Sequence, residues 1–111
     1  MATLTYGDIV RKVRATFEHA DARMIFEHIA IEIVMVGEGS GVFYFEVAER
    51  ACVIEPYNYY DHDGVLTGDT SVFLKLASKE LHVSEALEQG LLKYEGDMRK
   101  LKLCLDNLRL P

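Results

Sequence analysis

The stretch Gly90-Leu91-Leu92-Lys93-Tyr94-Glu95-Gly96-Asp97-Met98 holds two glycines, and each of them predicts a change of secondary structure. Gly90 follows a helical segment, and a glycine directly after a helix takes the left-handed conformation that ends it. Residues 91–95 are typical of a strand. Gly96 and Asp97 predict a turn from that strand into a helix capped by Asp97. The stretch therefore predicts a helix, a strand and a second helix with no linker between them.

The last helix, which begins at Asp97, carries two apolar faces. Spacing at three and four residues places most of its large apolar side chains on one face. These are Met98, Leu101, Leu105 and Leu108, with Cys104 at the edge. Leu103 lies almost opposite. A single apolar residue on the wrong side of a helix is usually only an exposed leucine, but it also fits a face that contacts a ligand cavity or a partner.

Upstream of this stretch the hydrophobic pattern changes its period several times. A helix is predicted around Ile9, Val13 and Phe17, and a helical pair over 69–77 and 84–89, the first capped by Asp69, Thr70 or Ser71. Strands are predicted over 29–36, 42–47, 50–57 and 65–67, with a hairpin at 37–41 and a loop at 58–64. Alternation in the first two strands predicts an antiparallel sheet with one face on a core. The predicted order is α-β-β-β-β-α-α-β-α.

Composition and charge narrow the function. The chain has 111 residues, a mass of 12.6 kDa and a formal net charge of −6, which predicts one domain over residues 1–111. Residues 24–96 hold thirteen acidic and four basic residues and so a charge of −9, whereas both ends are mildly cationic. A nucleic-acid binder needs a basic face, so that class is excluded.

The residues that could carry chemistry do not form a reactive group. Cys52 and Cys104 lie in apolar runs without a basic neighbour, so we expect buried, unreactive thiols. Asp61-His62-Asp63 concentrates possible metal ligands, but no second cluster completes a site. We therefore expect no enzyme, no metal and no cofactor. No signal peptide or membrane span is recognisable, so we expect a cytoplasmic protein.

The second half of the chain resembles the sterol-carrier-protein lipid-binding domain. That family reads D-F-L-x-L-x-x-G-K-L-x-P-x-x-A-F-x-x-G-K-L-x-I-x-G-D-M, and the residues from Val72 to Met98 follow it without a gap. Lys79, Val83 and Leu91 depart from the pattern, where the family has glycine, proline and lysine. The resemblance implies an α+β fold in which a five-stranded mixed sheet has helices packed on one face and encloses an apolar tunnel.

The resemblance also implies a function, which is non-catalytic binding or carriage of a long-chain lipid: a fatty acid, fatty acyl-CoA, a sterol or an isoprenoid. We expect apolar residues of the second half to line the tunnel or its wall, namely Phe73, Leu76, Leu81, Leu87, Met98, Leu101, Leu103 and Leu105. His82, Arg99 and Lys102 are the candidates for a lipid head group. We expect at most transient membrane contact, and a protein partner or a homodimer stays open.

A second hypothesis also fits the sequence. The family includes accessory proteins of quinone biosynthesis, so the chain is alternatively an interaction subunit of a lipid or quinone biosynthesis enzyme. Its tunnel would then be vestigial, and its acidic centre would be a docking face.

Overall fold

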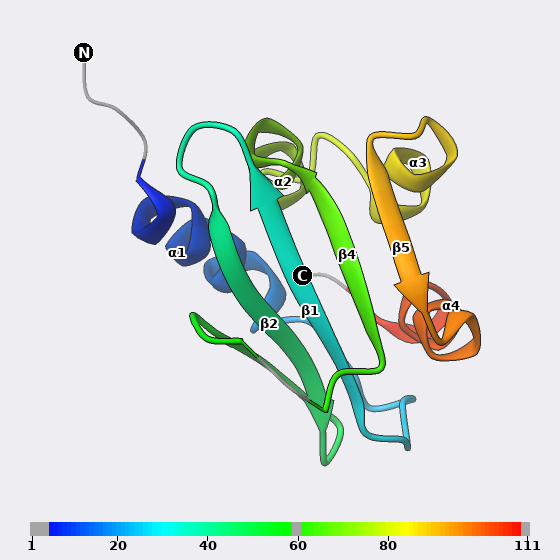
Figure 1. The fold of residues 1–111 in the computed structure, drawn as a ribbon. Helices are drawn as coiled ribbons and strands as arrows, with labels where there is room; N and C mark the ends of the chain where they lie inside the picture. The colour runs from blue at the N-terminus through cyan, green and yellow to red at the C-terminus, as the bar shows by residue number, and fades with distance from the viewer. Residues whose placement is uncertain (1–4, 59–60, 110–111) are drawn as a thin grey trace.

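Helices and strands follow one another in the predicted order in the computed structural model, which describes residues 5–58 and 61–109 (Figure 1). Residues 59–60, which belong to the predicted loop 58–64, lie outside the described residues. The elements are α1 (Tyr6–Phe17), β1 (Ile29–Val36), β2 (Gly41–Ala48), β3 (Ala51–Glu55), β4 (Gly64–Asp69), α2 (Thr70–Ala77), α3 (Val83–Glu88), β5 (Leu92–Gly96) and α4 (Met98–Asn107).

The strands form one mixed sheet in the order β3-β2-β1-β4-β5, which confirms the predicted five-stranded mixed sheet. The central pair, β1 and β4, is parallel, and every other neighbouring pair is antiparallel. Ile33 on β1 is paired with Phe43 on β2 and with Leu66 on β4. These three side chains therefore share one face of the sheet, because residues in register across neighbouring strands point the same way.

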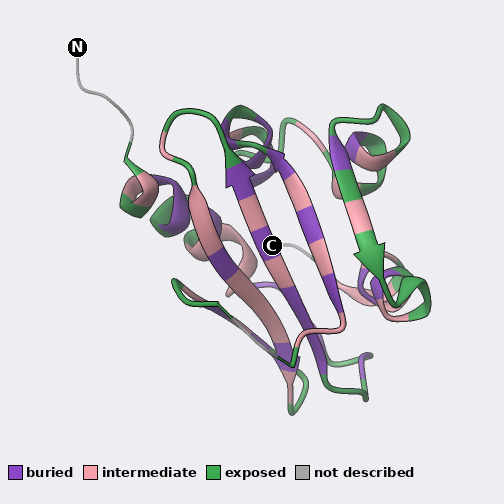
Figure 2. Cartoon of the chain, in the orientation of Figure 1, coloured by how far each residue is buried: buried purple, intermediate pink, exposed green. Residues whose placement is uncertain are grey.

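The helices pack on that face of the sheet and leave the other face uncovered (Figure 1). Ile31, Ile33 and Phe43 are buried beneath the helices, whereas Glu32 and Tyr44, which alternate with them, are only half-buried (Figure 2). On α2, Phe73 meets Phe43 edge to face, with ring centroids 6.3 Å apart. The alternation predicted for β1 and β2 is confirmed, and it places the core between the sheet and the helices.

Polar caps fix where the helices begin. Asp69 accepts a hydrogen bond from the backbone N–H of Ser71 at 2.9 Å, so Asp69 caps α2 and Thr70 is its first residue. Asp97 caps α4 as predicted and accepts from the backbone N–H of Lys100 at 3.1 Å.

The third strand is shorter than the predicted 50–57. Glu49 and Arg50 have positive φ angles of 52° and 63° and form the two-residue turn between β2 and β3, so β3 starts at Ala51. It ends at Glu55, before Pro56, because proline lacks the N–H that would continue the ladder.

Gly96 fixes the junction between β5 and α4. Its φ is 140°, and a Cβ at this position would lie 2.4 Å from the backbone oxygen of Asp63 and from Cα of Gly64. The next residue, Asp97, donates its backbone N–H to the same Asp63 oxygen at 2.9 Å. Only glycine allows this close approach of the end of β5 to the start of β4.

This close approach predicts unequal effects of alanine at the two glycines of the stretch. Gly96→Ala should lower the free energy of unfolding by roughly 3 kcal/mol, because the new methyl group meets backbone on β4. Gly90→Ala is the matched control: its φ is +76° but its Cβ would meet nothing within 4 Å, so it should cost only about 1 kcal/mol. If urea denaturation shows that both variants lose the same free energy of unfolding, this explanation of the junction is wrong.

Candidate functional site

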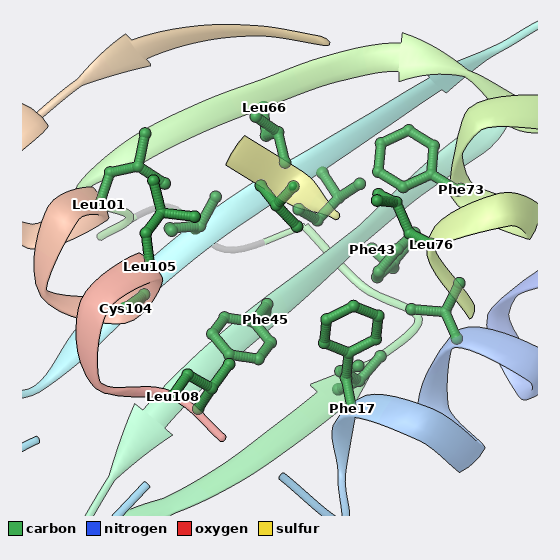
Figure 3. Close-up of a pocket in the computed structure, with 15 residues that line it drawn as sticks. Phe17, Phe43, Phe45, Leu66, Phe73, Leu76, Leu101, Cys104, Leu105 and Leu108 are labelled. Carbon is green, nitrogen blue, oxygen red and sulfur yellow. The ribbon is translucent and has the colours of Figure 1, made fainter. Parts of the chain in front are cut away.

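An apolar cavity lies between the buried face of the sheet and the helices (Figure 3). Its volume is about 100 Å³. The side chains that line it come from the inner face of four strands and from every helix: Val13, Phe17, Ile31, Ile33, Phe43, Phe45, Ile54, Leu66, Phe73, Leu76, Val83, Leu101, Cys104, Leu105 and Leu108. None of them carries a charge, so the cavity suits an apolar ligand or an apolar part of one.

The cavity is shaped by two groups of helix residues that face each other over the strands. In Figure 3, Leu101 and Leu105 of α4 lie on one side, and Phe73 and Leu76 of α2 lie on the other. Phe17, at the end of α1, closes the lower side of the view. The amphipathic pattern of each helix turns these residues toward the sheet.

The two thiols near the cavity are not suited to nucleophilic chemistry. Burial raises the pKa of Cys104, which lines the cavity, to about 12, and it raises the pKa of Cys52 to about 11. Both thiols are therefore protonated near neutral pH, whereas the thiolate is the reactive form.

The cavity is smaller than most ligand sites. Pockets for small molecules usually measure about 300–1,000 Å³, several times the volume here. A long-chain ligand therefore requires part of the wall to move outward. The open tunnel implied by the resemblance stays a prediction.

Polar contacts hold α4 over the cavity at both of its ends. At the first end, Lys100 donates from Nζ to the Asp63 carboxylate at 2.8 Å and to the backbone oxygen of His28 at 3.1 Å. At the other end, Arg109 and Asp21 exchange two backbone hydrogen bonds, at 2.6 and 3.0 Å. Between these ends, α4 contributes only apolar contacts to the cavity wall.

Asp63 joins three parts of the fold through its side chain. Its carboxylate accepts from the backbone N–H of Ala30 at 2.8 Å as well as from Lys100. Burial raises the pKa of this carboxyl, but the hydrogen bonds from Lys100 and Ala30 outweigh that effect and hold the pKa below its usual value. The ionised form of Asp63 is therefore the one that ties α4 to β1.

The residues expected to line the tunnel divide into two groups in the structure. Phe73, Leu76, Leu101 and Leu105 line the cavity. Leu81, Leu87 and Leu103 are half-buried against the core but do not line it, and Met98 is 54% exposed in the first turn of α4. The inward face of α4 is centred on Leu101 and Cys104, which turns Leu103 away from the cavity.

The three head-group candidates are all exposed, and none of them lines the cavity. His82 is the N-cap of α3, where its backbone N–H donates to the Glu85 carboxylate at 3.2 Å. Arg99 donates twice to Glu27, at 2.5 and 2.8 Å. Lys102 points to solvent on α4.

Most of the remaining lining residues come from the strands, whose sequence pattern predicts only a face on a core. The alternation of apolar residues in β1 and β2 could have indicated these lining residues. The buried face that it predicts also forms one wall of the cavity. Phe17, Cys104 and Leu108 belong to apolar helix faces that the sequence also indicated, whereas Val83 gave no signal.

The part of the chain that the structure describes offers neither a metal site nor a membrane-spanning helix. Within residues 5–58 and 61–109, no group of three or more histidine, cysteine or acidic side chains could hold a metal ion. Asp63 of the Asp61-His62-Asp63 sequence instead binds Lys100 and the backbone of Ala30. In the same part of the chain, no helix is long and apolar enough to cross a membrane.

Comparisons with known proteins agree on a family. Residues 14–103 match the model of the SCP-2 sterol transfer family. The UbiJ-SCP2 ubiquinone synthesis protein has a similar structure, with a TM-score of 0.62 and 16% identity over 91% of this chain and 90% of that one. The structure of palmitated SCP2L2 from Aedes aegypti is also similar, with a TM-score of 0.61 and 14% identity. That match covers 95% of this chain and 93% of the other. These likenesses show the fold.

A larger protein contains a similar fold. The sec-alkylsulfatase Pisa1 from Pseudomonas sp. matches with a TM-score of 0.57 and 16% identity over 74% of this chain. This chain spans only 13% of that protein. Among the curated proteins, none matches this sequence.

The contacts of Asp63 predict a pH-dependent stability. Asp63→Asn should lower the free energy of unfolding by about 2 kcal/mol at neutral pH, because a hydrogen-bonded carboxylate and its ion pair with Lys100 are lost. Since the folded pKa lies below the unfolded value of about 3.9, this contribution is present above that pH and disappears as the pH falls through the folded pKa.

Denaturation curves from neutral to acid pH test this prediction. The difference between the wild-type protein and Asp63→Asn should shrink in acid. Asp106→Asn, on the exposed side of α4, is the control and should cost much less. A difference that stays constant down to the acid limit would show that the charge of Asp63 does not hold α4.

Proposed function

This chain belongs to the SCP-2 sterol transfer family, and we propose that it is a non-catalytic carrier of a long-chain lipid, with residues 1–111 forming one lipid-binding domain. The observation that carries the proposal is the cavity, whose lining is uncharged and comes from strands and from every helix. Membership of the family supports lipid binding or transfer in general. Our proposal adds the kind of lipid, which is one with a flexible chain.

A flexible chain is the ligand that this cavity fits best. A fatty acyl or isoprenoid chain can enter a narrow apolar space one segment at a time, whereas a rigid sterol needs the whole width at once. The apolar middle of α4 can move away from the sheet without breaking a strand pairing, because its polar contacts lie at its two ends. The cavity therefore widens by separating apolar surfaces, and the ligand replaces the contacts that are lost.

The head group of such a lipid would stay outside the cavity, because no charged side chain lines it. Of the three candidates, Arg99 already binds Glu27 and His82 caps α3. Lys102 is exposed on α4, close along the helix to Leu101 and Leu105. We propose Lys102 as the contact for a carboxylate or phosphate that stays outside the cavity beside α4.

Two measurements test the carrier function directly. Purified protein is denatured and extracted, and the released lipids are identified by mass spectrometry. A fluorescent fatty acid is then displaced by unlabelled fatty acid. A carrier yields a long-chain lipid in about equal molar amount or binds the probe competitively. No extracted lipid, together with no binding at micromolar concentration, would refute the proposal.

The second candidate function is an accessory interaction subunit with a vestigial cavity. The observations that favour it are the small volume of the cavity and the acidic uncovered face of the sheet, where Glu55, Tyr44, Glu32, Val65 and Glu95 form one row across the strands. A similar structure belongs to a ubiquinone synthesis protein. If the chain is an accessory subunit, a larger side chain that fills the cavity should stabilise the protein. It should leave the affinity for the protein partner unchanged.

A pair of substitutions on α4 separates the two functions. Leu105→Trp fills part of the cavity and should weaken fatty-acid binding by about tenfold or more, because the chain loses apolar contact area. Leu103→Trp, two residues along the same helix and outside the cavity lining, is the control and should bind as the wild-type protein does. Circular dichroism and urea denaturation check that both variants fold. Equal affinities would place the ligand elsewhere.

A further inference from the structure

The segment between α1 and β1 presents two large apolar side chains to solvent. Phe26 is 74% exposed and Met24 is 65% exposed, more than any other large hydrophobic side chain among the described residues. Their neighbours Ala22 and Ile25 are each only 1% exposed, and the backbone N–H of Ile25 donates to Ala22 at 3.0 Å. The segment is therefore anchored in the core, and its turn holds Met24 and Phe26 outward.

An arginine from another part of the chain lies over the exposed ring. The guanidinium carbon of Arg50 is 5.7 Å from the centroid of the Phe26 ring. Arg50 and Glu49 both have positive φ in the turn between β2 and β3, where asparagine and glycine are the usual residues. This turn and the segment before β1 lie at the same end of the sheet, the lower end in Figure 1.

The same segment is linked to residues that line the cavity. Asp21 pairs through its backbone with Arg109, which follows the C-cap of α4. Phe17, which precedes the segment, and Leu108, which precedes Arg109, both line the cavity. The exposed residues therefore belong to the stretch of chain that joins α1 to β1 and that pairs, through Asp21, with the residue after the C-cap of α4.

We propose that Met24 and Phe26, together with Arg50, form a docking patch for the surface of a phospholipid bilayer. This inference rests on the proposed carrier function, since a carrier must collect its lipid from a membrane. Apolar side chains beside an arginine are typical of segments that enter the interface, with rings among the acyl chains and the guanidinium group at the phosphates. The neighbouring Arg23 is not counted, because its guanidinium group donates to the Asp21 carboxylate at 2.8 Å. We name Met24, Phe26 and Arg50 the docking patch.

The size of the docking patch favours a bilayer over a protein partner. A stable protein interface buries about 1,200–2,000 Å² in total, far more than two side chains supply. Insertion into a bilayer needs no matching surface, and the burial of one or two apolar side chains gives weak and reversible binding. Weak binding also suits the net charge of −6, which opposes lasting adhesion to anionic lipid.

The absence of tryptophan from the sequence permits a direct test. Phe26→Trp places a single fluorescent reporter in the docking patch. With vesicles of phosphatidylcholine and phosphatidylglycerol in equal parts, its emission should shift to the blue and be quenched by brominated acyl chains. Leu91→Trp is the matched reporter, on an exposed apolar position at the other end of the sheet, and should not respond. Equal responses, or none, would overturn the proposal.

Substitution of the patch gives a second test. Met24→Ser/Phe26→Ser should lower the affinity for the same vesicles by about tenfold or more, whereas Val36→Ser/Leu91→Ser, which also removes two exposed apolar side chains, should not. Arg50→Glu should weaken binding to the mixed vesicles more than binding to pure phosphatidylcholine.

The docking patch and the cavity can fail separately. If the patch variant loses vesicle binding but keeps the wild-type affinity for fatty acid in solution, both proposals stand. If fatty acid does not bind while Phe26→Trp still enters vesicles, only the carrier function fails. If Phe26→Trp ignores vesicles and sedimentation shows a dimer that the patch variant dissociates, the patch is a protein interface and the membrane proposal is wrong.

Discussion

The position of α4 depends on one junction, where the start of β4 meets the end of β5. Gly96 approaches the backbone of Asp63 and Gly64 so closely that a side chain is excluded, and Asp97 binds the Asp63 oxygen before it caps α4. The Asp63 carboxylate then binds both the backbone of Ala30 on β1 and the ammonium group of Lys100 on α4. Backbone packing and one half-buried ion pair together set the direction in which α4 leaves the sheet.

That direction gives the molecule its cavity. Because α4 is tied by polar contacts at its two ends, its apolar middle faces the residues of α2 across a space that side chains do not fill (Figure 3). Separating apolar surfaces costs no buried hydrogen bond, so this wall is the part of the fold best able to yield to a chain. The segment that carries Met24 and Phe26 joins α1 to the sheet beside the same interior. The cavity proposed to hold the lipid and the docking patch proposed to contact the membrane are therefore neighbours.

Local patterns predicted the elements well because each rests on interactions within a few residues. Gly90, Asp97 and the alternation in β1 and β2 act through turns, caps and strand faces, and all of them have the predicted roles. The cavity was predicted less completely. Met98 and Leu103 are apolar residues of α4, but whether they face the cavity depends on how the helix is rotated against the sheet. Arg99 binds Glu27, a residue far away in the sequence, and no local pattern indicates such a pair.

The sequence by itself therefore determined the order of helices and strands, the mixed α+β class, the resemblance to a lipid-binding family and the unreactive character of the thiols. The order of the elements and the character of the thiols follow from propensity, periodicity and neighbouring residues, which are local. The family and its α+β class follow from the resemblance of residues 72–98 to a known motif. Only the tertiary structure decided which side chains line the cavity, how small that cavity is, which ion pair holds α4, and that Met24 and Phe26 point outward. Each of these depends on distances between segments that are remote in the sequence, and such distances are fixed when the chain packs.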